Sequence, residues 1–140
     1  MIDKNSGEII VGNKTTIGPN SSMEEILSLN LGQSRNQGDH KNGWTWLTER
    51  NVLLENKYFI MNFLFFDNKL KEIYFVVSEM KFNLESDWDS WSELQELLNL
   101  EKYKVWLANE VGNQEDFDWG KIWADYDSKG GSSSISMRYK

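Results

Sequence analysis

The stretch YFIMNFLFF at Tyr58–Phe66 is followed by the pair Asp67-Asn68 and then by KLKEIYFVVS at Lys69–Ser78. Both runs are rich in aromatic and β-branched residues, which favour strands. Asp and Asn tolerate the positive φ angles that a two-residue hairpin turn requires. These residues therefore predict a β-hairpin. Apolar residues lie on both of its faces, so we expect it to form the centre of a sheet.

Weaker strand patterns precede this hairpin. A bulge or turn near Glu49–Asn51 would divide one of them, so that region is either two strand pieces or one interrupted strand. The polar, glycine-containing segment Gln33–Gly43 predicts an exposed loop. The short runs that predict strands are Gly7–Val11, Thr15–Ile17, Trp44–Leu47 and Val52–Glu55.

The C-terminal region predicts a second hairpin. Lys121–Tyr126 and Ser133–Tyr139 read as strands around the loop Asp127–Ser132. In the second of them, apolar residues alternate with serine and arginine, which is typical of a half-buried strand. We expect Ser133–Tyr139 to be an edge strand, open to pairing with a second chain.

Two helices are predicted. Ser22-Met23-Glu24-Glu25 fits a capping box, and Gly32 is placed to end a helix of two to three turns. A second helical segment begins at Ser86-Asp87-Trp88-Asp89 and ends at Gly112; it is either one helix or two helices divided at Asn99. Among its aromatic residues, we expect Trp91 and Trp106 to belong to the core.

These elements predict one α+β domain over residues 1–140. The expected order is β(β)αβββαββ, with two main helices on an antiparallel sheet of about five to six strands. The length suits a single core, and the seven Trp, seven Phe and five Tyr residues are enough to fill it.

Charge narrows the range of partners. The formal net charge is −7, and twelve acids against three lysines fall between Leu84 and Asp127. An acidic field of this kind repels phosphates, so we expect neither a nucleic-acid nor a membrane partner, and it attracts basic proteins. With no cysteine and no apolar run of signal-peptide length, a cytoplasmic location is expected.

The inventory of chemical groups argues against an enzyme. His40 is the only histidine, which excludes mechanisms and metal sites that need two. No metal or cofactor is expected. The calcium-loop pattern that begins at Asp125 fails at Lys129 and Ser136, where coordinating side chains are required. Because carboxylates are numerous, a small carboxylate-dependent hydrolase stays open as a third interpretation.

The remaining feature of the sequence is that several Trp residues are close neighbours of Asp residues. Large aromatic rings are enriched at binding hot spots, and neighbouring carboxylates can meet basic groups of a partner. We therefore predict an acidic, Trp-rich binding surface. Its candidate residues are Asp87, Trp88, Asp89, Glu93, Asp116, Asp118, Trp119, Trp123 and Asp125.

The C-terminal third also resembles a known class of proteins. The motifs are DWDSWSE at 87–93, KVWL at 104–107, EVG at 110–112, WGKI at 119–122 and YDSKGGSSSI at 126–135. Over roughly residues 84–139 they are similar to small bacterial immunity proteins of contact-dependent growth inhibition and polymorphic toxin systems. The similarity is fainter over Thr16–Leu31 and Trp44–Ser78.

The resemblance implies a cytoplasmic protein without enzymatic activity that binds one cognate toxin domain and occludes its active site or substrate face. Many such toxins are nucleases with cationic surfaces, so a basic nuclease domain is the expected partner. We expect the chain to be a monomer or a weak homodimer. The alternative is a carbohydrate- or small-ligand-binding module that uses exposed Trp platforms.

Overall fold

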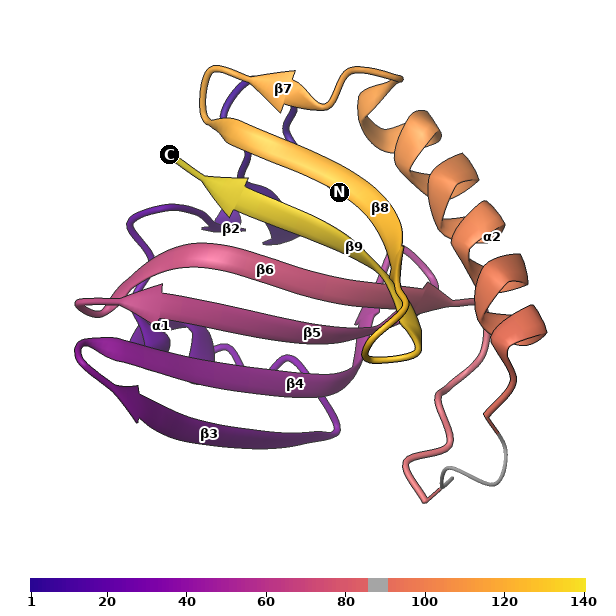
Figure 1. Ribbon diagram of the computed structural model, residues 1–140. Coiled ribbons are helices and arrows are strands. Elements are labelled where there is room, and N and C mark those ends of the chain that lie inside the picture. The colour runs from indigo at the N-terminus through magenta and orange to yellow at the C-terminus, as the bar shows by residue number, and fades with distance from the viewer. Residues whose placement is uncertain (86–90) are drawn as a thin grey trace.

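The computed structural model describes residues 1–85 and 91–140. Within these residues the chain forms nine strands and two helices (Figure 1). Their bounds are β1 Ile9–Gly12, β2 Thr15–Ile17, α1 Met23–Leu27, β3 Ser34–Lys41, β4 Trp44–Leu54, β5 Lys57–Phe66, β6 Lys69–Ser78, α2 Glu93–Val111, β7 Asp116–Phe117, β8 Gly120–Asp127 and β9 Ser132–Tyr139.

The architecture is an antiparallel α+β fold, as the sequence predicts, but the main sheet is larger than expected. It has seven strands in the order β3-β4-β5-β6-β9-β8-β7, where five to six were predicted. Strands β1 and β2 form a separate two-stranded sheet. The additional strands are β3, which the sequence predicted as a loop, and the two-residue β7.

The central hairpin is confirmed. Strands β5 and β6 pair antiparallel from Tyr58 opposite Ser78 to Phe66 opposite Lys69. The turn residues Asp67 and Asn68 have φ angles of 52° and 60°. Both values lie in the left-handed region that a tight hairpin turn requires, and β6 is the middle strand of the sheet.

The prediction of a loop over Gln33–Gly43 was wrong. Residues Ser34–Lys41 form β3 at one edge of the sheet and pair only with β4. An edge strand exposes one row of its backbone and most of its side chains, so a polar sequence is compatible with it. Charged side chains such as Arg35 and Lys41 also discourage pairing of this edge with another chain.

The prediction that Ser133–Tyr139 is an edge strand was also wrong. Strand β9 lies inside the sheet, between β6 and β8. Its alternating apolar residues Ile135, Met137 and Tyr139 are buried as expected, but Ser133 is buried as well. A second chain therefore has no free edge at β9.

The helices differ from prediction in length and continuity. Helix α1 is a single short turn that ends at Leu27, well before Gly32. Its Ser22 cap is confirmed, since the hydroxyl accepts a hydrogen bond from the amide of Glu25 at 3.2 Å. Helix α2 is unbroken at Asn99, and Gly112 ends it with φ 80°. Neither helix is long and apolar enough to cross a membrane within the residues described.

Helix α2 carries apolar residues on two sides. Leu100, Tyr103, Leu107 and Val111 are buried against the sheet. Outward-facing apolar residues are exposed, with Val105 at 63%.

Trp91 was predicted to be core but is 42% exposed, and its indole N–H donates to the carbonyl of Gly131. Trp106 packs against the core as predicted.

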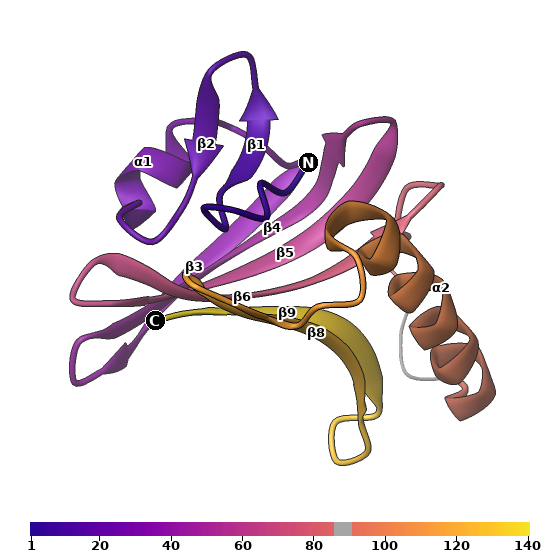
Figure 2. The ribbon, with the colours of Figure 1, turned by 90° about the horizontal axis from the view of Figure 1, so that it is seen from above.

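All the covering elements lie on one side of the sheet. Figure 2 shows α1 and the β1–β2 hairpin above the sheet and α2 at its right-hand side, where it packs on β8 and β9. The core forms beneath them, where Trp106 of α2 meets the rings of Phe59 and Phe75 at 5.8 and 5.6 Å. The opposite side, called the open face below, carries no helix within the described chain.

The stability of the fold at alkaline pH depends in part on Tyr103, which is buried in this core. Burial raises its pKa from 10.0 to about 12, and the charge of Glu96 contributes to the increase. The unfolded chain loses this proton first, so stability falls as the pH rises from 10 towards 12. Between about pH 9 and about pH 12, we expect the wild type to lose about 2–3 kcal/mol more than Tyr103→Phe in urea unfolding. Equal losses would contradict this assignment.

Candidate functional site

The open face carries a continuous row of polar and aromatic residues across five strands. Side chains alternate between the two faces of a strand, so the neighbours of buried residues point to the open face. In β8, for example, Ile122 is buried and Trp123 points to the opposite side. Cross-strand pairing aligns one row of such residues, namely Thr48, Asn62, Tyr74, Ser136 and Trp123.

A groove follows this row towards the end of the β8–β9 hairpin. It has a volume of about 520 Å³ and lies where the pairing of β6 with β9 ends, beyond Phe75 opposite Ile135. We call it the hairpin groove. Its polar and aromatic lining includes Asn62, Tyr74, Glu96, Trp123, Asp125, Asp127, Ser134 and Ser136.

Acidic residues gather at this end of the molecule. Three of them, Glu96, Asp125 and Asp127, line the groove, and among the residues that the structure describes neither a lysine nor an arginine does. Glu93, at the start of α2, lies nearby. Partial desolvation raises the pKa of Tyr126, and the negative charges of Glu93, Glu96 and Asp127 raise it further.

Basic residues lie on the other side of Trp123. Lys121 Nζ is 5.1 Å from the centre of the indole ring, and the guanidinium carbon of Arg138 is 5.6 Å from it. Arg138 also pairs with Glu72 at 2.8 Å. The hydroxyl of Tyr74 donates to the same carboxylate. The open face is therefore polarised, with paired cations on one side of Trp123 and acids on the other.

The structure brings together two of the predicted site residues, Trp123 and Asp125, which line the same groove. Glu93 is close enough to Tyr126 of the same strand to raise its pKa. The structure places Asp116 opposite Lys121 and Asp118 just before Gly120, towards the other end of β8. Lys121 is roughly 13 Å along the strand from Asp125, at about 3.3 Å per residue. There they border a shallow depression with Lys4 and Gln114. The predicted acidic surface is thus divided into two regions.

Trp119 has a packing role at that far end. Its ring stacks on Phe117 with 5.2 Å between the ring centres and lies 5.7 Å from Tyr139. The indole N–H donates to the carbonyl of Lys4 at 2.9 Å. These contacts attach the N-terminal segment to β7 and β9. The remaining predicted residues Asp87, Trp88 and Asp89, and the helix start at Ser86–Asp89, lie outside the described residues.

Several groove residues were missing from the sequence prediction. Asp127 follows Asp125 at the two-residue spacing of one strand face, so alternation along β8 was sufficient to find it. Glu96 occupies the first turn of α2. Tyr74 and Ser136 come from strands that are neighbours only through the observed strand order, and no local pattern indicates this.

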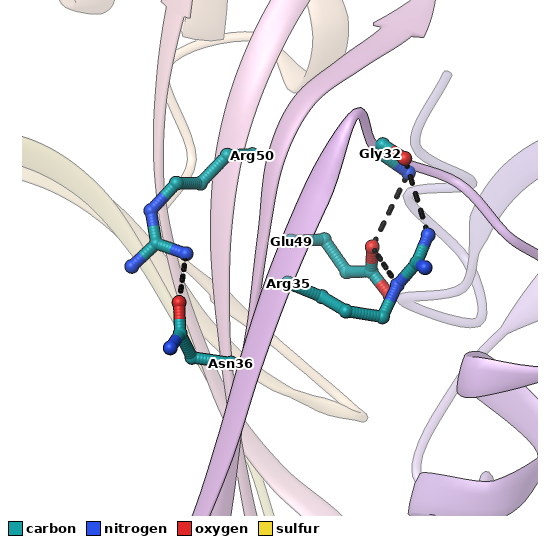
Figure 3. A network of polar contacts seen from close by, with 5 residues as sticks. All are labelled: Gly32, Arg35, Asn36, Glu49 and Arg50. Carbon is teal, nitrogen blue, oxygen red and sulfur yellow. Dashed lines mark hydrogen bonds and ion pairs between the residues drawn. The ribbon is translucent and has the colours of Figure 1, made fainter. Parts of the chain in front are cut away.

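A second polar network lies far from the groove and is structural (Figure 3). Glu49 is 0% exposed, and its carboxylate accepts from Arg35 Nε at 3.0 Å and from the amide of Gly32 at 3.2 Å. Arg35 also donates to the carbonyl of Gly32. On the open face, Arg50 binds the side chain of Asn36. The ion pair between Arg35 and the buried Glu49 connects β3 to β4, and the bonds to Gly32 attach the segment after α1.

Comparison of the chain with protein-family models, with curated proteins and with solved structures found no match. The site is therefore defined by its own geometry. Among the residues that the structure describes, no group of three His, Asp or Glu side chains is placed to hold a metal ion. What the hairpin groove offers is a concave surface with aromatic walls and carboxylates, suited to binding a basic partner.

Proposed function

We propose that this protein is an immunity protein, which binds a basic toxin domain in the cytoplasm and blocks its active site or substrate face. The supporting observation is the hairpin groove, where three acidic residues and, within the described chain, no basic residue lie beside the ring of Trp123. The proposal requires no catalysis by this chain. A nuclease is the expected toxin, because its substrate-binding surface is cationic.

Electrostatics supports this assignment. A net charge of −7, with acids towards both ends of β8, steers a basic protein towards this part of the sheet. Acids at the rim of an interface mainly raise the rate of association and make it sensitive to salt. The aromatic residues Trp123 and Tyr74 supply the apolar area on which affinity depends.

If the interface lies at the hairpin groove, removing the charges of Asp125 and Asp127 should weaken toxin binding. Asp125→Asn/Asp127→Asn is expected to weaken binding of the toxin domain encoded next to this chain by at least about tenfold. Asparagine keeps the oxygen with which Asp127 caps the amide of Lys129, so the hairpin is preserved. Calorimetry at about 50 mM and about 300 mM salt measures the affinity and its screening.

The matched control is Asp116→Asn/Asp118→Asn. It removes the same charge from the opposite end of β8. We expect it to weaken binding by less than about threefold, since long-range steering changes but direct contacts do not. Equal effects of the two double variants would contradict an interface at the hairpin groove.

A further inference from the structure

We propose that the hairpin groove accepts the guanidinium group of an arginine side chain from the bound partner. This inference rests on the proposed function and specifies the contact at its centre. The groove would then hold the side chain at the centre of the interface. The partner must in turn present a protruding arginine on a basic surface.

The charge of the groove selects a cation. Glu96, Asp125 and Asp127 line it, and the nearest cations are directed elsewhere. Arg138 is paired with Glu72, and Lys121 lies over the Trp123 ring. The groove therefore holds an excess of negative charge that a cationic side chain would neutralise.

Unused hydrogen-bonding groups lie inside the groove. Ser136 is only 3% exposed, and its side chain makes no hydrogen bond to another described residue. It stands opposite both Tyr74 and Trp123 in the register, on the groove side of β9. Asp125 likewise has no hydrogen-bond or ion-pair partner in the described chain. Among the described residues, no fully buried side-chain oxygen lacks a hydrogen-bond partner. Because Ser136 has no such partner there, its hydroxyl must contact solvent, and Ser136 lines the groove.

Arginine fits these groups better than lysine or a neutral ligand does. A guanidinium has five N–H donors in one plane, which suits the carboxylate of Asp125 and the hydroxyl oxygen of Ser136 in the groove. It binds carboxylates through paired hydrogen bonds and also stacks on aromatic rings such as Trp123 and Tyr74. A lysine ammonium is a more strongly hydrated point charge and offers no flat surface for stacking.

The test uses three matched small probes: N-acetyl-arginine methylamide, its neutral citrulline counterpart and its lysine counterpart. Binding is followed by NMR through the indole N–H signal of Trp123, assigned with Trp123→Phe, and the amide signals of β8 and β9. We expect saturable shifts with the arginine probe and an affinity at least about fivefold higher than for either counterpart. Asp125→Asn and Ser136→Ala should each lower it, whereas Asp116→Asn should not.

The outcomes separate this inference from the proposed function. The guanidinium assignment would be overturned if the citrulline probe or the lysine probe bound as tightly as the arginine probe. It would also be overturned if the shifts lay away from Trp123. The guanidinium assignment would also be overturned if Ser136→Ala left the toxin affinity unchanged and the arginine probe gave no response. Toxin binding by the wild type would in that case still support an immunity protein. A specific arginine response without toxin binding would support the groove chemistry and reject the toxin as its partner.

Discussion

Phe75→Ala is expected to lower the free energy of unfolding by about 3–5 kcal/mol. Phe75 is 1% exposed in the middle strand of the sheet, with its ring centre 6.0 Å from that of Phe59 and 5.6 Å from that of Trp106. Removing the ring leaves a cavity where the sheet meets α2, and close-packed neighbours relax only in part. Urea unfolding followed by circular dichroism measures the loss.

The control for this variant is Phe66→Ala. Phe66 ends the neighbouring strand, where its ring is 41% exposed and contacts Trp44. The same change in volume is expected to cost about 1 kcal/mol or less there, because water already reaches the ring. Comparable losses for the two variants would show that the core does not centre on β6.

The second large effect is expected from Arg35→Met, at about 3–5 kcal/mol of unfolding free energy. The substitution leaves the carboxylate of Glu49 buried without its charged partner, with the Gly32 amide as its one remaining donor (Figure 3). Breaking one side of a buried ion pair costs more than the pair contributes, since the desolvated charge persists. Thermal and urea unfolding at neutral pH measure the effect.

Two comparisons isolate the buried charge. Arg50→Met changes the same residue type on the other face of the sheet, where its partner is the neutral Asn36, and is expected to cost about 0.5 kcal/mol or less. Arg35→Met/Glu49→Leu removes both charges and should be more stable than Arg35→Met. If the double variant were less stable, the cost would come from lost packing rather than from an unpaired carboxylate.

The elements predicted correctly have signals that are local in sequence. The turn at Asp67-Asn68 was predicted because both residues tolerate positive φ, which both adopt. The interruption near Glu49–Asn51 is a register shift in one continuous strand, and Asn51 has φ 54° there. Capping at Ser22 was equally local. Each of these features depends on a few adjacent residues.

The errors concern relations between distant segments. Strand β3 gains its hydrogen bonds from β4, and its polar side chains gave no sign of this. The position of β9 between β6 and β8 depends on which strands share the core, which alternation within one strand cannot reveal. Trp91 was assigned to the core because it is large and apolar, yet its hydrogen bond to Gly131 holds it at the surface.

The candidate site was predictable in composition but not in shape. The association of tryptophan with acid drew attention to Trp123 and Asp125, which the structure places beside one groove. The same pattern included Trp119, whose ring packs on Phe117 instead. Sequence spacing does not distinguish a ring that points to the open face from one that covers the N-terminal segment.

Growth rescue tests the proposed immunity function. The candidate toxin is the C-terminal domain of the product of the adjacent upstream gene, expressed in a sensitive bacterial strain without this protein, with it, or with Asp125→Asn/Asp127→Asn at an equal level. We expect the wild type to restore growth and the double variant to protect less well. Undiminished killing, with both proteins present in folded form at comparable amounts, would contradict the assignment as an immunity protein for that toxin.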